Sequence, residues 1–213
     1  MLSLNLRYFA KNSNLPRVHI SMVGFMNAGK SSLMNAITQQ PTSIVDNYPG
    51  TTADTKIALM EIHKIGPCKL LDTAGVDEAG TLGQKKLAKT LSAIKESDIV
   101  LTIVDPFNFN PEPFNSVINL AIRRGKTCAI IFNQFSEKGN TEEFNSKKEL
   151  ALASLTSIAN KCGRQSLPNI TINAKNSKAT NSIIIPFIAS LKKQSKPIPP
   201  LPPRILGKGK TNI

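Results

Sequence analysis

The sequence predicts an α/β fold, in which a mostly parallel sheet of six strands carries about five helices on both faces. Two observations support this prediction. Short apolar segments alternate with segments of helical spacing along the chain, and the first apolar segment, VHISMVG at 18–24, ends in glycine and leads directly into a helical pattern. Such alternation is typical of parallel sheets, whose right-handed crossovers place helices on the faces.

Each strand is expected where a short run of branched apolar residues would be buried in the sheet. The expected strands are 18–24, 56–65, 68–72, 98–105, 126–133 and 169–173. Helices are expected where apolar residues recur at helical spacing, over 33–40, 82–96, 113–124, 142–161 and 177–192. The first helix should stop before Pro41, because a residue that precedes proline disfavours helical geometry.

Length and charge predict one catalytic domain at 18–192 with a basic segment on either side. The chain has 213 residues, 40% of them hydrophobic, and no run of 18 apolar residues that would span a membrane. The net charge is +13, but residues 1–17 and 192–213 hold nine of the 27 basic residues and no acidic residue. Residues 1–17 have the composition of an organelle presequence or of an ordinary terminus. The Pro- and Lys-rich segment 193–213 is predicted to be an extended tail or the start of a linker to a further domain.

The three cysteines are widely spaced and lack a CxxC pattern. Cys68, Cys128 and Cys162 have no neighbouring histidine at a metal-ligand spacing. This argues against a disulfide framework and against an iron–sulfur or zinc site on this chain. Cys68 and Cys128 are expected to be buried thiols.

The segment GFMNAGKS, at 24–31, matches the phosphate-binding pattern GxxxxGK[ST] between a strand and a helix. Its backbone amides and the helix N-terminus favour phosphate oxygens, Lys30 is expected to reach the β and γ phosphates, and Ser31 is expected to bind Mg²⁺. The sequence therefore predicts a P-loop nucleoside triphosphatase. The loop residues expected to bind nucleotide are Gly24, Asn27, Ala28, Gly29, Lys30, Ser31 and Ser32.

Two further segments complete the expected phosphate and metal site. The segment LLDTAG, at 70–75, includes Asp72 at the end of a strand and Gly75 three residues later. Asp72 is the expected Mg²⁺ partner, and the Gly75 amide can contact the γ phosphate. The segment YPGTTAD, at 48–54, contains Thr51 and Thr52. One of these threonines can complete the Mg²⁺ shell while the γ phosphate is present. The candidate catalytic residues are Lys30, Thr52 and Asn27. The Mg²⁺ ligands are expected to be Ser31, Thr52 and Asp72.

The base-recognition pattern is incomplete. Asn133 closes a strand where GTPases carry Asn-Lys-x-Asp, but here the sequence is Asn-Gln-Phe-Ser. Ser136 is a poor substitute for the aspartate that accepts two guanine hydrogens, and Glu137 is either a substitute shifted by one residue or a surface side chain. Residues Ala174 and Lys175 stand where a base-clasping loop is expected. Val76 occupies the position where a water-orienting glutamine would follow DTAG.

These motifs resemble the TrmE/Era-type GTPases. More narrowly, HKIGPCKLLDTAGVDEAGTLGQKKLAKT, at 63–90, resembles the GTPase domain of the FeFe-hydrogenase maturation factor HydF. The resemblance implies slow, K⁺-assisted hydrolysis of GTP to GDP, with Asn27 helping to hold K⁺ and Val76 replacing the glutamine. It also implies hydrogenase-maturation partners and a possible homodimer. In that family a dimerisation domain and a cluster-binding domain follow, and their Cys and His ligands are not expected on this chain.

The leader resembles hydrogenosomal presequences of anaerobic protists, since it opens with MLS and carries Arg7 beside an aromatic residue. A hydrogenosomal or mitochondrion-like matrix location is therefore expected if the leader is a presequence, and a cytoplasmic one otherwise.

Two other functions stay open. An Era-like GTPase of RNA or ribosome assembly would bind RNA through its Lys-rich tail, although that tail lacks aromatic residues for stacking on bases, so nucleic acid is the less favoured partner. A nucleotide-binding regulatory domain with little turnover would explain the incomplete Asn133–Ser136 motif.

Overall fold

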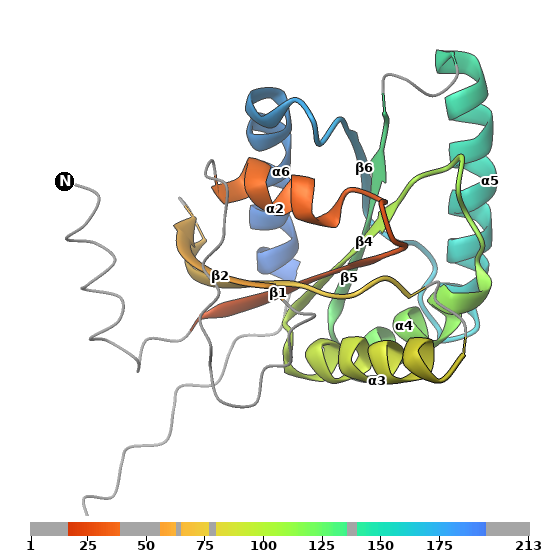
Figure 1. Cartoon of the computed structure of the whole chain (residues 1–213), viewed down its shortest axis with the longest axis horizontal. Helices are drawn as coiled ribbons and strands as arrows, with labels where there is room; N and C mark the ends of the chain where they lie inside the picture. Colours follow the sequence, from red (N-terminus) through yellow and green to blue (C-terminus); the bar gives the residue numbers. More distant parts are fainter. Residues whose placement is uncertain (1–16, 39–55, 63–64, 77–79, 136–139, 195–213) are drawn as a thin grey trace, which may run out of the picture. The chain divides into compact units, whose positions relative to one another are not determined.

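The computed structural model describes residues 17–38, 56–62, 65–76, 80–135 and 140–194 (Figure 1). Within them, six strands form one sheet in the order β2-β3-β1-β4-β5-β6. The strands are β1 (Val18–Gly24), β2 (Lys56–Ile62), β3 (Gly66–Asp72), β4 (Ile99–Val104), β5 (Thr127–Asn133) and β6 (Asn169–Ile172). All neighbouring strands are parallel except β2, which runs antiparallel to β3 at one edge. The predicted α/β fold with a mostly parallel sheet is confirmed.

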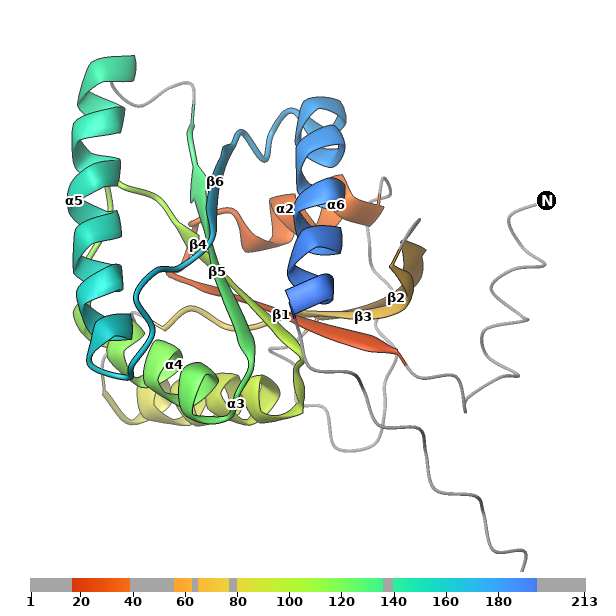
Figure 2. The same ribbon diagram turned by 180° about the vertical axis from the view of Figure 1, so that it is seen from behind.

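Five helices lie in the described residues, namely α2 (Lys30–Thr38), α3 (Gly80–Glu96), α4 (Glu112–Arg123), α5 (Thr141–Asn160) and α6 (Ser177–Gln194). Helices α2 and α6 pack on each other, and α3, α4 and α5 pack in series. Figures 1 and 2 show these two groups on opposite faces of the sheet. This division follows from right-handed crossovers. Helix α2 connects β1 to the edge formed by β2 and β3, whereas α3, α4 and α5 connect successive strands in the opposite direction, from β3 toward β6.

Two predicted boundaries differ from the structure. The second strand ends at Ile62 and not at residue 65, because the Ile65 amide donates to the Ile62 carbonyl in a turn and Gly66, at φ 92°, begins the next strand. Helix α2 begins at Lys30, three residues earlier than predicted, so the lysine and serines of the phosphate loop belong to its first turn. The other strands and helices agree with the prediction to within two residues at each end.

The centre of the sheet is fully buried. Every residue of β4 and of β5 is buried, as expected for parallel strands that are covered by helices on both faces. The largest buried side chains between sheet and helices include Phe114, Phe132 and Phe144. Because β1, β3 and β5 run parallel, their carboxyl ends lie at the same edge of the sheet. At this edge the connection from β1 leads to α2 on one face, and the connection from β3 leads to α3 on the other. Ligands bind at such switch points in open α/β sheets.

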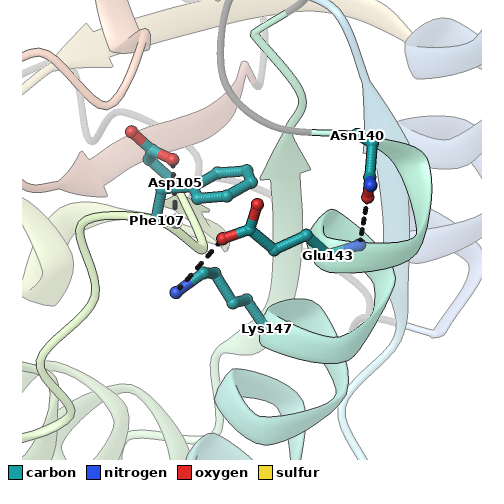
Figure 3. A network of polar contacts seen from close by, with 5 residues as sticks. All are labelled: Asp105, Phe107, Asn140, Glu143 and Lys147. Atoms are coloured by element: carbon teal, nitrogen blue, oxygen red, sulfur yellow. Dashed lines mark hydrogen bonds and ion pairs between the residues drawn. The ribbon is translucent and has the colours of Figure 1, made fainter.

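The loop after β4 is fixed by local polar contacts near the start of α5 (Figure 3). Asp105 accepts a hydrogen bond from the backbone amide of Phe107 at 3.0 Å. Asn140 caps α5 by accepting from the Glu143 amide at 2.8 Å, and Glu143 pairs with Lys147 at 3.8 Å. The Lys147 ammonium lies 5.5 Å from the centre of the Phe107 ring, which joins the loop to the helix.

The structure also bears on the sequence expectations for cysteines and membranes. Cys68 and Cys128 are buried, as predicted. Among the described helices, none combines the length and apolar character that crossing a bilayer requires.

Candidate nucleotide-binding site

The loop between β1 and α2 has the backbone geometry of a phosphate cradle. Asn27 has φ 62° and Gly29 has φ 101°, both in the left-handed region. Asparagine is one of the few residues with a side chain that tolerates this region. The Ala28 amide donates to the Phe25 carbonyl at 3.2 Å, and Phe25 is held by stacking on Phe114 of α4. The loop is therefore a fixed turn whose residues cannot be exchanged freely.

Both glycines of the motif are required by close packing. A Cβ atom on Gly24 would lie 2.3 Å from the carbonyl oxygen of Ile103 on β4. A Cβ atom on Gly29 would lie 2.1 Å from the side-chain nitrogen of Asn133 at the end of β5. The two glycines thus let the loop approach the neighbouring strands and leave its outer surface open.

Lys30 lies across the loop that precedes it. Its ammonium donates to the carbonyl oxygens of Gly24 at 3.1 Å and Phe25 at 2.7 Å, and the residue is 8% exposed. Lys30 is also the first residue of α2, whose first helical bond runs from the Leu33 amide to the Gly29 carbonyl. The amides of Ser31 and Ser32 precede that bond, and amides in this position bind anions at helix N-termini. Positive charge and amide donors therefore meet at one place.

Ser31 and Asp72 form the candidate metal site. The Ser31 hydroxyl donates to the Asp72 carboxylate at 2.6 Å, across 41 positions of sequence. Burial raises the pKa of Asp72 above its ordinary value of 3.8, against the lowering effects of the Ser31 hydrogen bond and the charges of Lys30 and Lys56. A hydroxyl and a buried carboxylate are oxygen ligands of the kind that Mg²⁺ takes, and a cation would favour the charged carboxylate. The residues present therefore fit Mg²⁺.

The segment after Asp72 is tied to the strand and loop of the phosphate motif. Thr73 donates to the Met22 carbonyl from its amide at 3.2 Å and from its hydroxyl at 2.9 Å. The Val76 amide donates to the Gly24 carbonyl at 3.3 Å. Gly75 lies between these two attachments and is half-buried. DTAG and the P-loop are thus adjacent, as both motifs require.

Asn133 joins three segments that are far apart in sequence. Its side-chain nitrogen donates to the Ala28 carbonyl at 3.0 Å, and its side-chain oxygen accepts from the Ala174 amide at 3.0 Å. The loop around Ala174 is shaped by Asn173, whose side chain accepts from the Lys175 amide at 3.1 Å. Ala174 is buried and Lys175 is exposed. The predicted base-recognition segments therefore meet behind the phosphate loop.

Most of the predicted site residues are brought together by the fold. Asn27, Gly29, Lys30, Ser31 and Ser32 line a depression of about 220 Å³. Thr51, Thr52, Ser136 and Glu137 lie outside the described residues. The sequence patterns do not reveal two residues of the site: Phe135 also lines the depression, and Lys56 is near enough to lower the pKa of Asp72 in opposition to burial. Phe135 belongs to the segment Asn-Gln-Phe-Ser, which replaces the expected Asn-Lys-x-Asp. That replacement is the one feature of the sequence that could have pointed to Phe135.

A family profile decides the identity of this site. The profile of the family described as 50S ribosome-binding GTPase matches residues 19–134, more than half of the chain, and this range contains the P-loop, Asp72 and Asn133. The chain belongs to this family. It is thus a member of a GTPase family with a P-loop GTPase fold, as the motifs predicted.

One relative resembles this chain in sequence, and two solved structures resemble it in fold. GTPase Der from a Nitratiruptor species is 32% identical over 123 residues, which are 58% of this chain and 26% of that protein. The structure of Era from Aquifex aeolicus bound to GDP and AlF₄⁻ superposes with a TM-score of 0.62 at 21% identity, covering 89% of this chain and 60% of that one. An Era structure in complex with MgGDPNP and nucleotides 1506–1542 of 16S ribosomal RNA superposes with a TM-score of 0.62 at 20% identity, covering 90% and 61%.

These relatives are longer proteins. The chain spans about a quarter of the length of the Der protein and 60% of the length of the Era chain. The likeness to the Era structures, at 20% and 21% identity, concerns the fold alone.

Proposed function

We propose that this chain binds GTP with Mg²⁺ and hydrolyses it to GDP and phosphate, as a nucleotide-dependent switch. The observation that carries the proposal is the cluster of Lys30, Ser31 and Asp72 at the carboxyl edge of the sheet. Lys30 closes over the loop, Ser31 donates to a buried Asp72, and family membership supports a guanine nucleotide. Slow turnover is expected, because the described residues place the apolar Val76 after DTAG.

The chain's own groups would divide the work as follows. The Lys30 ammonium and the amides at the start of α2 would bind the β and γ phosphates and stabilise charge that develops on them. Ser31 and Asp72 would hold Mg²⁺, which when bound supplies positive charge beside the phosphates. Thr52 is proposed as the further metal ligand that binds only while the γ phosphate is present, which would couple the nucleotide to the loop at 48–54.

K⁺ is proposed as an additional activator. Asn27 is exposed, lines the depression and is held at φ 62° by the loop. Its side-chain oxygen is a suitable ligand for a hard cation next to the phosphates. A cation there would neutralise developing charge, as an arginine finger does in other GTPases.

Nucleotide binding and turnover can be tested on one set of proteins. Calorimetry with GDP, GTP and ATP in KCl and then in NaCl should show guanine nucleotides binding more tightly than ATP. Phosphate release from GTP, measured separately, should be faster in KCl than in NaCl. Lys30→Ala should abolish turnover, whereas Lys178→Ala, which removes an exposed lysine at the start of α6, should not. Turnover that survives Lys30→Ala unchanged would rule out this site. Equal affinity for GTP and ATP would favour the regulatory domain with little turnover.

RNA is the partner class that the comparisons support best. The matched family is described as ribosome-binding, and one similar structure is an Era protein bound to 16S ribosomal RNA. We therefore place the Era-like function ahead of hydrogenase maturation, reversing the order that the segment 63–90 suggested. The chain's net charge of +13 is consistent with a polyanionic partner. Absence of RNA binding at low salt would remove this part of the proposal.

The hydrogenase-maturation role remains a second candidate, supported by the resemblance of residues 63–90 to HydF. The organelle location and a possible homodimer depend on that resemblance and on the leader. Binding of the purified chain to an FeFe-hydrogenase maturation protein, stronger with GTP than with GDP, would favour it over the RNA function.

A further inference from the structure

Five basic side chains gather at the end of the sheet opposite the nucleotide site. Three of them, Arg123, Arg124 and Lys126, lie at the end of α4 and just before β5. The other two, Lys161 and Arg164, follow the end of α5. Strand β5 separates this cluster from Asn133, and its seven residues span roughly 20 Å. The cluster is therefore a surface distinct from the nucleotide site.

A side-chain hydrogen bond brings the two segments together. The Cys162 thiol, next to Lys161, donates to the Asn119 side chain at 2.7 Å. Asn119 lies one helical turn before Arg123 on the same face of α4. Figure 2 shows the chain after α5 running beside α4. Arg164 is held against the end of α5, because its amide donates to the Ala159 carbonyl at 3.1 Å.

The cluster has little acidic compensation. Within the described ranges, no ion pair joins any of the five side chains to a carboxylate. Residues 113–126 and 150–169 contain no Asp or Glu. Two acids lie at this end of the sheet: Glu96 is the last residue of α3, and Asp98 precedes β4 and already accepts from the His19 amide at 2.8 Å. Arg123, Arg124 and Lys161 are exposed, so their charge faces solvent.

The dipoles of the neighbouring helices do not account for all five positive charges of the cluster. Both α4 and α5 end at this edge, and one cation near each C-terminus would offset the partial negative charge there. That effect is confined to the last turn, whereas Lys126 and Arg164 lie beyond the helices. An exposed excess of like charge also repels itself, and a bound polyanion would offset that repulsion.

We propose that Arg123, Arg124, Lys126, Lys161 and Arg164 form a binding surface for the phosphate backbone of RNA. This inference rests on the proposed RNA partner and names where this domain would contact it. Three of the five are arginines, whose planar fork donates two parallel hydrogen bonds to phosphate oxygens. The surface has no aromatic residue among the five, so binding is expected to depend on charge and not on sequence.

The test compares two triple variants of the full chain. Arg123→Gln/Arg124→Gln/Lys161→Gln removes three charges from the cluster. Lys147→Gln/Lys178→Gln/Lys193→Gln removes three charges elsewhere and is the matched control. The probe is a fluorescently labelled single-stranded RNA, titrated at several salt concentrations between about 50 and 200 mM. Thermal unfolding and GTP turnover are measured on the same preparations.

The cluster variant should bind RNA about tenfold or more weakly at low salt. Its slope of log K against log salt should become shallower by about 2, because each phosphate that the protein no longer neutralises removes roughly 0.7 from the slope. The control should keep most of the wild-type affinity. Arg123→Lys/Arg124→Lys keeps the charge and loses only the guanidinium fork, so this variant should bind RNA more tightly than the cluster variant, which separates loss of charge from loss of fold. GTP turnover should be the same in all of them.

Equal weakening in both triple variants would overturn the proposal, because binding would then follow net charge alone. Binding to phosphatidylserine vesicles, but not to RNA, would replace it with a membrane surface. If the wild-type chain binds no RNA at low salt, this surface and the RNA part of the proposed function both fail. Failure of GTP turnover in the wild type would instead refute the nucleotide part and leave the surface untouched.

Discussion

The side chain of Asn133 donates to the carbonyl oxygen of Ala28 at 3.0 Å, although the two residues are 105 positions apart. The same side chain accepts from the Ala174 amide. Asn133 is 1% exposed, so both hydrogen bonds are shielded from water. The phosphate loop, the end of β5 and the loop before α6 are therefore held by a single residue.

Replacing Asn133 with alanine should weaken nucleotide binding and stability together. The change leaves the Ala28 carbonyl and the Ala174 amide without this partner, at a cost of about 1–3 kcal/mol for each buried group. We expect GDP affinity to fall about tenfold or more, measured with a fluorescent GDP analogue. Asn181→Ala is the matched control, because Asn181 donates to Ala36 and Ile37 at the far end of α2. The control should lower the melting temperature without changing GDP affinity, and equal affinity losses in both would contradict the assigned role.

Replacing Gly29 with alanine should abolish nucleotide binding. The new methyl group would lie 2.1 Å from the Asn133 nitrogen, and alanine would have to adopt φ 101°. Gly125→Ala separates these two effects, since Gly125 also has positive φ, at 67°, but no atom lies within 4 Å of an added Cβ. The control should lose only about 1–2 kcal/mol of stability from backbone strain. Calorimetry with GDP distinguishes the variants, and normal binding by Gly29→Ala would show that the loop can move away from Asn133.

The sequence patterns predict the sheet and the phosphate loop because both depend on local regularities. The strand TCAIIFN is predicted to within one residue, since an unbroken apolar segment between turns indicates a buried strand. Gly24 and Lys30 can be recognised because their spacing follows from the geometry of one strand, one loop and one helix.

Other parts of the site depend on pairings between distant segments, which a local pattern does not contain. The approach of Phe135 to Gly29, and of Lys56 to Asp72, results from how β5 and β2 are placed in the sheet. The early end of β2 at Ile62 depends on one turn hydrogen bond. The partners of Asn133 could not be predicted either, because one is a backbone carbonyl that any residue at position 28 would supply.

The two buried thiols should make the fold lose stability at alkaline pH. Burial raises the pKa of Cys68 to about 12 and of Cys128 to about 11, from 9.0 for a free thiol. Because these pKa values are raised in the folded state, the stabilisation is full below pH 9 and is lost as pH rises through 11 to 12. At pH 10 each thiol should cost about 1.4 kcal/mol, since the unfolded chain ionises first.

Urea unfolding at pH 8 and at pH 10 measures this loss, and Cys128→Ala should reduce it by about half. Alkylation gives an independent check. At pH 9, Cys68 and Cys128 should react only after unfolding, while the half-buried Cys162 reports whether the reagent reaches the native protein. Rapid alkylation of Cys128 in the native state would show that β5 opens locally.

Replacing Thr90 with valine should stabilise the protein. The Thr90 hydroxyl, on α3, is buried and has no hydrogen-bond partner within the described part of the chain. An unpaired buried hydroxyl costs about 1–3 kcal/mol, and valine has nearly the same shape without that group. We expect the urea midpoint to rise with an unchanged slope. Thr73→Val is the matched control, because the Thr73 hydroxyl donates to the Met22 carbonyl at 2.9 Å and its loss should lower the midpoint. If Thr90→Val lowered it too, the hydroxyl would have to have a partner in the folded protein. If Thr90→Val raised the midpoint but slowed GTP turnover, the unpaired hydroxyl would be retained for function at the expense of stability, as such groups at functional sites are.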